Sequence, residues 1–354
     1  MAESNHYGAT AARRHGQPGR ETRPDSVTID IHAHVFVPEA GAYVAPHLDP
    51  ATIPLTSFST PATQALNRKQ DADRRTVGTQ HGPRLADLDA MGIDIQLCAP
   101  APPQSYYTVP GKHGVIGNRM VNDGIKAFVD ARPDRFLGLG TVPLQDPAEA
   151  VNELERCMGP LGFKGIQVLT NVGGRELSDP AFEPVWAAAE RLGALVMIHP
   201  NGFTEGQRFA RFYFNNIIGN PLDTTMALHH LIFDGVLERY PDLKILAVHG
   251  GGFLPAYSGR IDHAWGARTD ARGALPKPPT AYLKKVYFDT IVFTPHQLEY
   301  LVKIYGVDQI LMGTDFPFDM ADSDPIGHIC AVESFDAATR AALAGGNAKK
   351  LLGL

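Results

Sequence analysis

Two histidines, His32 and His34, stand two residues apart in the apolar run TIDIHAHVF. In a β-strand alternate side chains point to the same face, so both imidazoles can reach one metal ion. By itself the pair could equally line a polar patch in a core. The spacing makes it worth asking whether other metal-capable groups occur at comparable places in the chain.

Three further groups with this capacity end other apolar runs: His199 in IHP, His249 in HGGG and Asp315 in GTDFP. Any one of them could be a hydrogen-bonded core residue or a loop cap. Together with the histidine pair they place metal-capable or proton-transferring groups at four separate strand ends. The set therefore predicts a polar active site rather than four unrelated structural residues.

Such a site needs strands to position it, and eight short apolar runs recur along the chain. Most of the segments between them have helical spacing, and this alternation is typical of an α/β fold of the (β/α)₈ or TIM barrel type. Barrel enzymes carry their active sites at the carboxyl ends of the strands. The predicted strands cover residues 28–36, 93–99, 136–144, 162–169, 194–200, 243–251, 286–292 and 309–317.

Local signals predict several of the helices. Asp146–Pro147 and Asp179–Pro180 each place an N-cap acceptor before a proline at the first helical position. Apolar residues at helical spacing predict a helix over 118–129, followed by Pro133, and a closing helix over roughly 336–352.

Two connections are much longer than usual: 37–84 after the first strand and 201–221 after the fifth. The first is rich in Pro and Thr and then basic, and the second is rich in Phe. Both follow the carboxyl end of a strand, so they are predicted to be long loop insertions that act as a lid, recognise substrate or contact another subunit.

Composition narrows the class of partner. The 354 residues carry a formal net charge of −6 with acids and bases interspersed, which argues against nucleic acid or an anionic membrane and favours a small molecule. The three cysteines, Cys98, Cys157 and Cys330, form no CxxC pair. This argues against a disulfide framework or thiolate zinc site and fits a reducing cytoplasm.

The first 26 residues are polar and lack the apolar stretch of a signal peptide. We expect residues 1–26 to form a disordered tail and residues 27–354 to form one barrel domain. No later run approaches the roughly 20 apolar residues needed to span a bilayer.

The chain resembles the amidohydrolase superfamily, and within it the branch typified by 2-amino-3-carboxymuconate 6-semialdehyde decarboxylase. The likeness covers roughly residues 28–352 and follows family order. It rests on the motifs IDIHAH, RLADLDAMGIDIQ, RFLGLGTVPLQDP, GIQV, IHP, LKILAVHGGGFLPAYSGRIDHAW, VYFDT, GTDFPF and GGNAKKLL.

The resemblance implies that His32, His34, His199 and Asp315 bind one zinc ion and leave a coordination position open, with manganese as an alternative metal. Nitrogen and oxygen ligands around an open position suit catalytic zinc. His249 would be the acid/base, and His249 or Asp315 would move the proton. Read without the resemblance, His249 could be a supporting or core histidine.

The resemblance also assigns Arg260 to a substrate carboxylate across a subunit boundary, which implies a homodimer or higher homo-oligomer. A planar bidentate donor suits that task, although an interface or surface salt bridge is the alternative for Arg260. The family uses a basic residue of the first long connection in the same way. Here the spacing does not match, so Lys69, Arg74 and Arg75 all stay open.

Binuclear relatives carry a carbamylated lysine at the end of the fourth strand. Lys164 instead begins that strand, so it would lie at the wrong end of the barrel. An ordinary lysine with an apolar stem is the better interpretation, which favours one metal ion over two.

The leading hypothesis is therefore metal-dependent, non-oxidative decarboxylation of a carboxylated, conjugated small acid, carboxymuconate semialdehyde-like or hydroxybenzoate-like, in aromatic catabolism. A second hypothesis is hydrolysis of a lactone or amide on the same scaffold, because one fold hosts many reactions. A third is a non-catalytic metal- or ligand-binding protein. The product distinguishes the first two: carbon dioxide or a new carboxylate.

Overall fold

All eight apolar runs contain strand residues in the structure, a computed structural model that describes residues 23–354. The third run is interrupted at Leu139, so β3 and β4 are two parts of one barrel strand. The barrel strands are β1 (Ile29–Val35), β2 (Ile95–Pro100), β3 (Phe136–Gly138), β4 (Gly140–Thr141), β5 (Gly165–Leu169), β8 (Leu195–His199), β9 (Lys244–Ala247), β10 (Tyr287–Asp289) and β11 (Ile310–Leu311).

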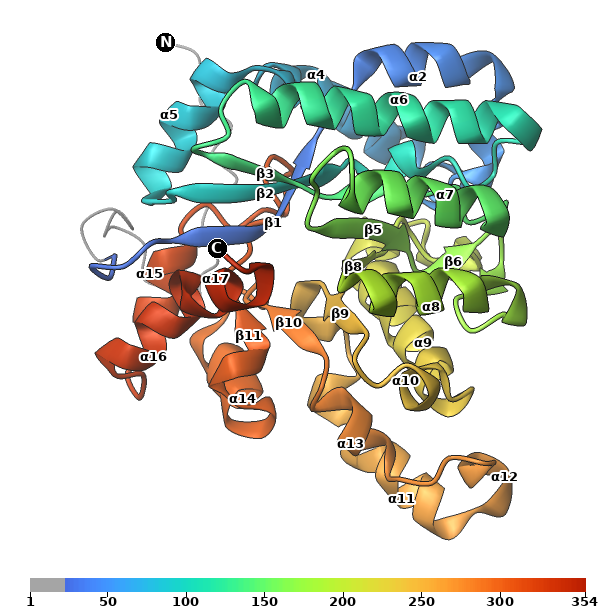
Figure 1. Ribbon diagram of the computed structural model, residues 1–354, viewed down its shortest axis with the longest axis vertical. Coiled ribbons are helices and arrows are strands. Elements are labelled where there is room, and N and C mark those ends of the chain that lie inside the picture. The colour runs from blue at the N-terminus through green and yellow to red at the C-terminus, as the bar shows by residue number, and fades with distance from the viewer. Residues whose placement is uncertain (1–22) are drawn as a thin grey trace.

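These strands are parallel and follow one another around a closed barrel (Figure 1). The Leu139 amide donates to the Cys98 carbonyl at 2.9 Å and joins β2 to the interrupted third strand. Between β1 and β11 the Ile31 amide donates to the Met312 carbonyl at 2.9 Å, and a parallel bridge pairs Ala33 with Phe316. The predicted (β/α)₈ barrel is confirmed.

A β-bulge in β1 decides which of its residues face the barrel interior. The pairing with β2 shifts register between Asp30 and Ala33. Before the shift, Ile31 packs in the inner cluster formed with residues of β2, β8, β9 and β11, whereas Ala33 packs in the cluster shared with the surrounding helices. Because bulges re-aim side chains, Asp30 faces the helices while His32 and His34 face the interior.

Helices surround the barrel and also fill the longer connections (Figure 1). Their bounds are α2 (Pro38–Val44), α3 (Pro54–Ser57), α4 (Pro61–Thr79), α5 (His81–Met91), α6 (Gly111–Asp130), α7 (Pro147–Met158), α8 (Glu183–Leu192), α9 (Asn220–Phe233), α10 (Val236–Arg239), α11 (Gly259–Ala267), α12 (Thr269–Arg272), α13 (Pro279–Leu283), α14 (Pro295–Tyr305), α15 (Pro325–Cys330), α16 (Ala337–Ala341) and α17 (Asn347–Leu352).

The predicted helix starts are present. Asp146 accepts from the Glu149 amide at 3.3 Å and begins α7, and Asp179 accepts from the Ala181 amide at 2.9 Å before a 3₁₀ turn that leads into α8. Helix α6 begins seven residues before the predicted 118, and a π-helical turn separates α16 from α17 within the predicted closing helix.

The two long connections are less irregular than predicted. The first, 37–84, consists largely of α2, α3, α4 and the start of α5, and the second, 201–221, contains a 3₁₀ turn and a π turn. Thr60 accepts from the Thr63 amide and Pro61 follows, so α4 begins with a regular N-cap. Its 19 residues are mostly polar, so no apolar periodicity revealed the helix.

Residues 1–22 of the predicted tail lie outside the described residues. From Arg23 onward the chain contacts the barrel, because the Arg23 guanidinium donates to the Asp94 carboxylate at 2.9 Å. Within residues 23–354, no helix is both long and apolar enough to cross a membrane. Helices α11, α12 and α13 form an extension that projects from the barrel (Figure 1).

We predict that Gly165→Ala severely destabilises the protein. Gly165 has φ +155°, and a Cβ there would lie 1.9 Å from the Leu195 carbonyl oxygen of the adjoining strand. Forcing β5 and β8 apart should cost about 3 kcal/mol or more of unfolding free energy in chemical denaturation. Gly266→Ala, where nothing lies within 4 Å, is the control and should be near neutral. Equal stability of the two variants would contradict this account of the strand pair.

Candidate functional site

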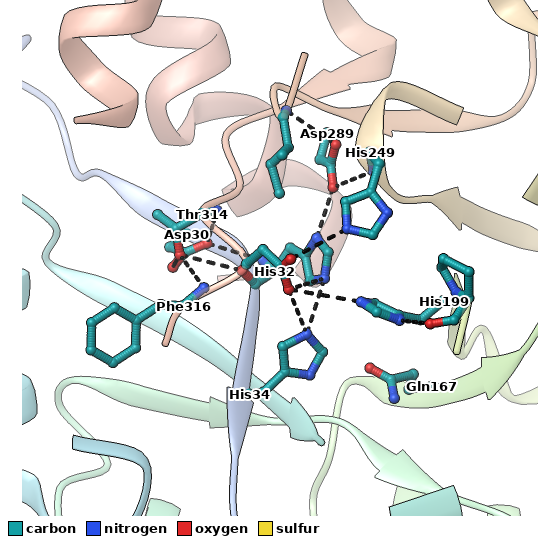
Figure 2. A network of polar contacts seen from close by, with 12 residues as sticks. Asp30, His32, His34, Gln167, His199, His249, Asp289, Thr314 and Phe316 are labelled. Carbon is teal, nitrogen blue, oxygen red and sulfur yellow. Dashed lines mark hydrogen bonds and ion pairs between the residues drawn. The ribbon is translucent and has the colours of Figure 1, made fainter. Parts of the chain in front are cut away.

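The four predicted histidines and Asp315 meet inside the barrel at the carboxyl ends of its strands, whereas Arg260 does not join them (Figure 2). Donor atoms of His32, His199, His249 and Asp315 all lie within 4.8 Å of one another. His34 joins them, since its Nε2 lies 3.2 Å from Nε2 of His32 and 3.0 Å from Oδ1 of Asp315. Tertiary structure thus brings together residues separated by more than 280 positions.

Three of the histidines are held with the same nitrogen facing the site. Nδ1 of His32 donates to the Asp289 carboxylate at 2.8 Å, and Nδ1 of His34 donates to the Pro100 carbonyl at 2.8 Å. Nδ1 of His199 donates to the Pro200 carbonyl at 2.7 Å. Because each Nδ1 carries the proton, each Nε2 presents a lone pair to the cluster, as a metal ligand must.

These groups fit a divalent metal ion. Nε2 of His199 is buried without a hydrogen-bond partner among residues 23–354, and it lies 3.8 Å from Oδ1 of Asp315. Burial lowers the pKa of His199 to about 3, so the ring is neutral. Burial alone would raise the pKa of Asp315, but the surrounding histidines hold it well below its usual range. Neutral nitrogens beside a carboxylate are a suitable ligand set for zinc or manganese.

His249 reaches the cluster from a strained turn. It has φ +54°, and the three glycines that follow also have positive φ. At Gly252 a Cβ would lie 2.2 Å from the Pro221 carbonyl oxygen, so the turn requires glycine there. Non-glycine residues in this conformation concentrate at functional sites, and Asp315 shares it with φ +63°.

The electrostatics of His249 differ from those of His199. Burial would lower the pKa of His249, but the hydrogen bond to Asp315 and the charge of that carboxylate raise it overall. Nε2 of His249 lies 3.4 Å from Oδ2 of Asp315. Both His34 and His249 reach Asp315. The assignment of His34 as a metal ligand and of His249 as the acid/base therefore stays a prediction.

Asp289 is a functional residue that sequence reasoning missed. It is fully buried, and besides His32 it accepts from the backbone amides of His249 and Gly250 at 3.0 and 2.8 Å. It therefore fixes one predicted ligand and the turn that carries the predicted acid/base. The signal was present in VYFDT, where an aspartate follows apolar residues at a strand end.

A buried network supports the site from the outer side of β1. Asp30 accepts from the Thr314 hydroxyl at 2.6 Å and from the His32 amide at 3.1 Å. It also accepts from Nε2 of Gln96 at 2.7 Å. Burial raises the pKa of Asp30 to about 6 in spite of these hydrogen bonds. Asp30 thus links the backbone at His32 to the residue before Asp315.

Arg84 of α5 completes this network. It is fully buried, and it donates to Oε1 of Gln96 at 2.7 Å and to the His34 carbonyl at 2.8 Å. Its guanidinium lies 4.9 Å from the centre of the Phe316 ring. A buried arginine that is hydrogen-bonded in this way fixes the backbone of β1 at the second histidine.

A cavity of about 620 Å³ opens above the cluster and is lined in part by His199, His249 and Asp315. Of the three basic residues left open in the first long connection, only Arg74 lines it, together with Arg68. Lys69 is exposed and pairs with Asp73 at 2.7 Å. The structure therefore favours Arg74 for contact with substrate.

Two further predicted positions are now placed. Lys164 lies immediately before the first residue of β5, and its Nζ donates to the carbonyl of Leu352, the last residue of α17, at 3.1 Å. Gln167 of β5 lies near His199 in Figure 2, and its Nε2 donates to the Pro100 carbonyl at 3.1 Å. Arg260 is exposed on α11 and does not line the cavity of its own chain.

The sequence model of the Amidohydrolase family matches residues 29–354. The chain belongs to this family. It is 35% identical over 272 residues to 2-amino-3-carboxymuconate-6-semialdehyde decarboxylase from Dictyostelium discoideum, covering 77% of this chain and 76% of the relative. The predicted branch is confirmed.

Two solved structures of decarboxylases are similar in fold to this chain. 5-Carboxyvanillate decarboxylase from Sphingomonas paucimobilis superimposes with a TM-score of 0.82 at 26% identity, covering 93% of this chain and 100% of that one. 5-Carboxyvanillate decarboxylase from Novosphingobium aromaticivorans, complexed with manganese and 4-hydroxy-3-methoxy-5-nitrobenzoic acid, gives 0.83 at 24% identity, covering 98% and 100%. At that identity the second likeness concerns the fold alone.

We predict that Thr314→Val weakens metal binding. The substitution keeps the shape but removes the hydroxyl donor to Asp30, so unfolding free energy should fall by about 1–3 kcal/mol. Metal affinity should fall about 10- to 100-fold in competition with a chelator, because the loop that carries Asp315 loses its support.

The matched control is Thr224→Val. Thr224 is also fully buried, and its hydroxyl has no hydrogen-bond partner among the described residues. This variant should keep wild-type metal affinity and stability. Equal metal affinity of the two variants would show that the Asp30 contact does not support the site.

Proposed function

We propose that this chain is a metal-dependent, non-oxidative decarboxylase of a carboxylated, conjugated small acid of the carboxymuconate semialdehyde or hydroxybenzoate type. The observation that carries the proposal is the convergence of His32, His34, His199 and Asp315 below a substrate-sized cavity. The relatives reported above are decarboxylases of acids of these two kinds.

His32, His34, His199 and Asp315 would hold one zinc or manganese ion per chain. When bound, such an ion supplies positive charge that orients a substrate oxygen and can activate water. Lone pairs on three buried imidazoles favour zinc, and the manganese in the Novosphingobium relative supports manganese as the alternative.

The chain's own groups would supply the proton that the reaction needs. Loss of carbon dioxide leaves the electron pair of the broken carbon–carbon bond on the substrate carbon, and one proton must be added there. His249 can hold that proton at Nε2, since Asp315 at 3.4 Å favours its charged form. The Gly250 to Gly252 turn and Asp289 keep the imidazole aimed at the cluster.

Two arginines would anchor substrate carboxylates. Arg74 lines the cavity and is buried, where a planar guanidinium can form paired hydrogen bonds. Arg260 lies outside the cavity of its own chain, so its predicted role requires a second subunit. We therefore propose a homodimer or higher homo-oligomer.

The proposed location is the cytoplasm. Cys98 and Cys157 are free thiols, and both are buried. Buried thiols that form no disulfide fit a reducing compartment.

We predict that activity requires the metal. Elemental analysis of the purified protein should find about one zinc or manganese ion per chain. Chelation should abolish carbon dioxide release from carboxymuconate semialdehydes or hydroxybenzoates, and one equivalent of metal should restore it. Metal without carbon dioxide, but with a new carboxylate from a lactone or amide, would replace decarboxylation by hydrolysis. Absence of metal from protein purified without chelator would contradict the site.

We predict opposite effects for two histidine variants. His249→Ala should lower kcat at least about 100-fold while metal stays bound, because the group that holds the proton is lost. His199→Ala should lose metal, because it removes a buried lone pair of the ligand set. The metal content of each variant is measured by elemental analysis after gel filtration. Metal loss from His249→Ala together with metal retention in a His34→Ala variant would exchange the roles of His34 and His249.

A further inference from the structure

One wall of the cavity is a single face of α4. The cavity-lining residues of this helix recur every three or four positions, so they share one side of it. From the first to the last of them the wall runs about 15 Å, at 1.5 Å per residue. The lining residues are Gln64, Asn67, Arg68, Gln70, Asp71 and Arg74.

Much of the remaining lining is apolar, although Asn201, Asn216 and Gln297 also contribute to it, and the α4 face is a continuous polar strip along the cavity. At about 620 Å³ it lies within the range of about 300–1,000 Å³ that is typical of sites for drug-sized ligands. A single ring held at the metal cluster would leave the N-terminal half of the α4 face without contact. The apolar walls include Ile53, Leu55, Ile217, Phe253, Val292 and Phe318.

The two arginines of this wall differ in their surroundings. Arg74 lies 3.8 Å from the Asp319 carboxylate. Desolvation raises the pKa of Asp71 and of Asp319, and the charge of Arg74 opposes the rise in both. Arg74 thus lies beside two acids of the protein, at the end of the wall nearer Asp315, where it can contact the carboxylate that the proposed reaction removes.

Arg68 has no such compensation. It lines the cavity and is exposed, so it lies where the cavity meets solvent, and no ion pair or hydrogen bond joins it to another residue of 23–354. Arg68 and Arg74 are six positions apart, which corresponds to about 9 Å along the helix axis. The cavity thus has, towards its solvent end, a cation that no described residue engages in an ion pair or hydrogen bond.

We propose that the substrate is an elongated acid, with an apolar body beyond the reacting ring and a second acidic group that Arg68 binds. This inference rests on the proposed decarboxylation, because that reaction places the first carboxylate at the metal cluster. The rest of the α4 face supplies amide groups along the body, and the apolar walls cover its sides.

The helix provides a matched control for Arg68. Lys69 is the next residue and carries the same charge, but it does not line the cavity and it pairs with Asp73 at 2.7 Å. Both residues are exposed, so methionine at either position should be tolerated by the fold. Arg68→Met and Lys69→Met remove the same net charge from the same helix, but only Arg68→Met removes a cation that lines the cavity.

Three probes separate length from charge: 2-hydroxybenzoate, 2-hydroxy-5-phenylbenzoate and 2-hydroxy-5-(4-carboxyphenyl)benzoate. Calorimetry on metal-loaded protein measures their affinities, and carbon dioxide release is recorded in parallel. The wild type should bind the long dianion about tenfold or more tighter than the long monoanion. Arg68→Met should remove most of that advantage, and Lys69→Met should retain it.

Equal wild-type affinities for the two long probes would overturn the inference. An equal loss of the dianion's affinity advantage in Arg68→Met and Lys69→Met would also overturn it. So would a failure of every probe to bind. If the affinity order is as expected and none of the probes releases carbon dioxide, the Arg68 contact is supported and the decarboxylation of hydroxybenzoates is contradicted.

Discussion

Three buried imidazole lone pairs facing one carboxylate are the feature on which the rest of this structure depends. His32, His34 and His199 each use Nδ1 to bind an oxygen of the protein, and each keeps Nε2 for the interior. Buried acceptors without donors cost free energy, and a divalent cation is the group that relieves this cost. The site is therefore arranged for a ligand that the protein itself does not supply.

Much of the surrounding structure serves to hold that arrangement. On the interior side Asp289 connects one histidine to the His249 turn. On the outer side Asp30 connects the strand that carries the histidine pair to the loop that carries Asp315, and Arg84 fixes the same strand from α5. Each support is buried and charged, so removing one partner would leave another unsatisfied.

The cavity adds a second level of organisation. Metal-site residues come from the barrel strands and the turns that follow them, whereas the polar wall comes from α4 within the long connection after β1. Barrel enzymes commonly vary their connections while the strand ends retain the chemistry. In this chain the helical form of that connection gives the wall a regular spacing of polar groups.

The sequence by itself determined the barrel, the helix N-caps at Asp146 and Asp179, and the residues that meet at the site, because apolar periodicity and capping are local properties. It could not reveal α4, whose polar residues show no apolar stripe, nor which of Lys69, Arg74 and Arg75 lines the cavity. Only the tertiary structure decided those points and the contacts of Asp30 and Asp289. No local pattern encodes contacts between residues far apart in the chain. Such contacts determine the bulge in β1, the pairing of β1 with β11 and the neighbours of each carboxylate.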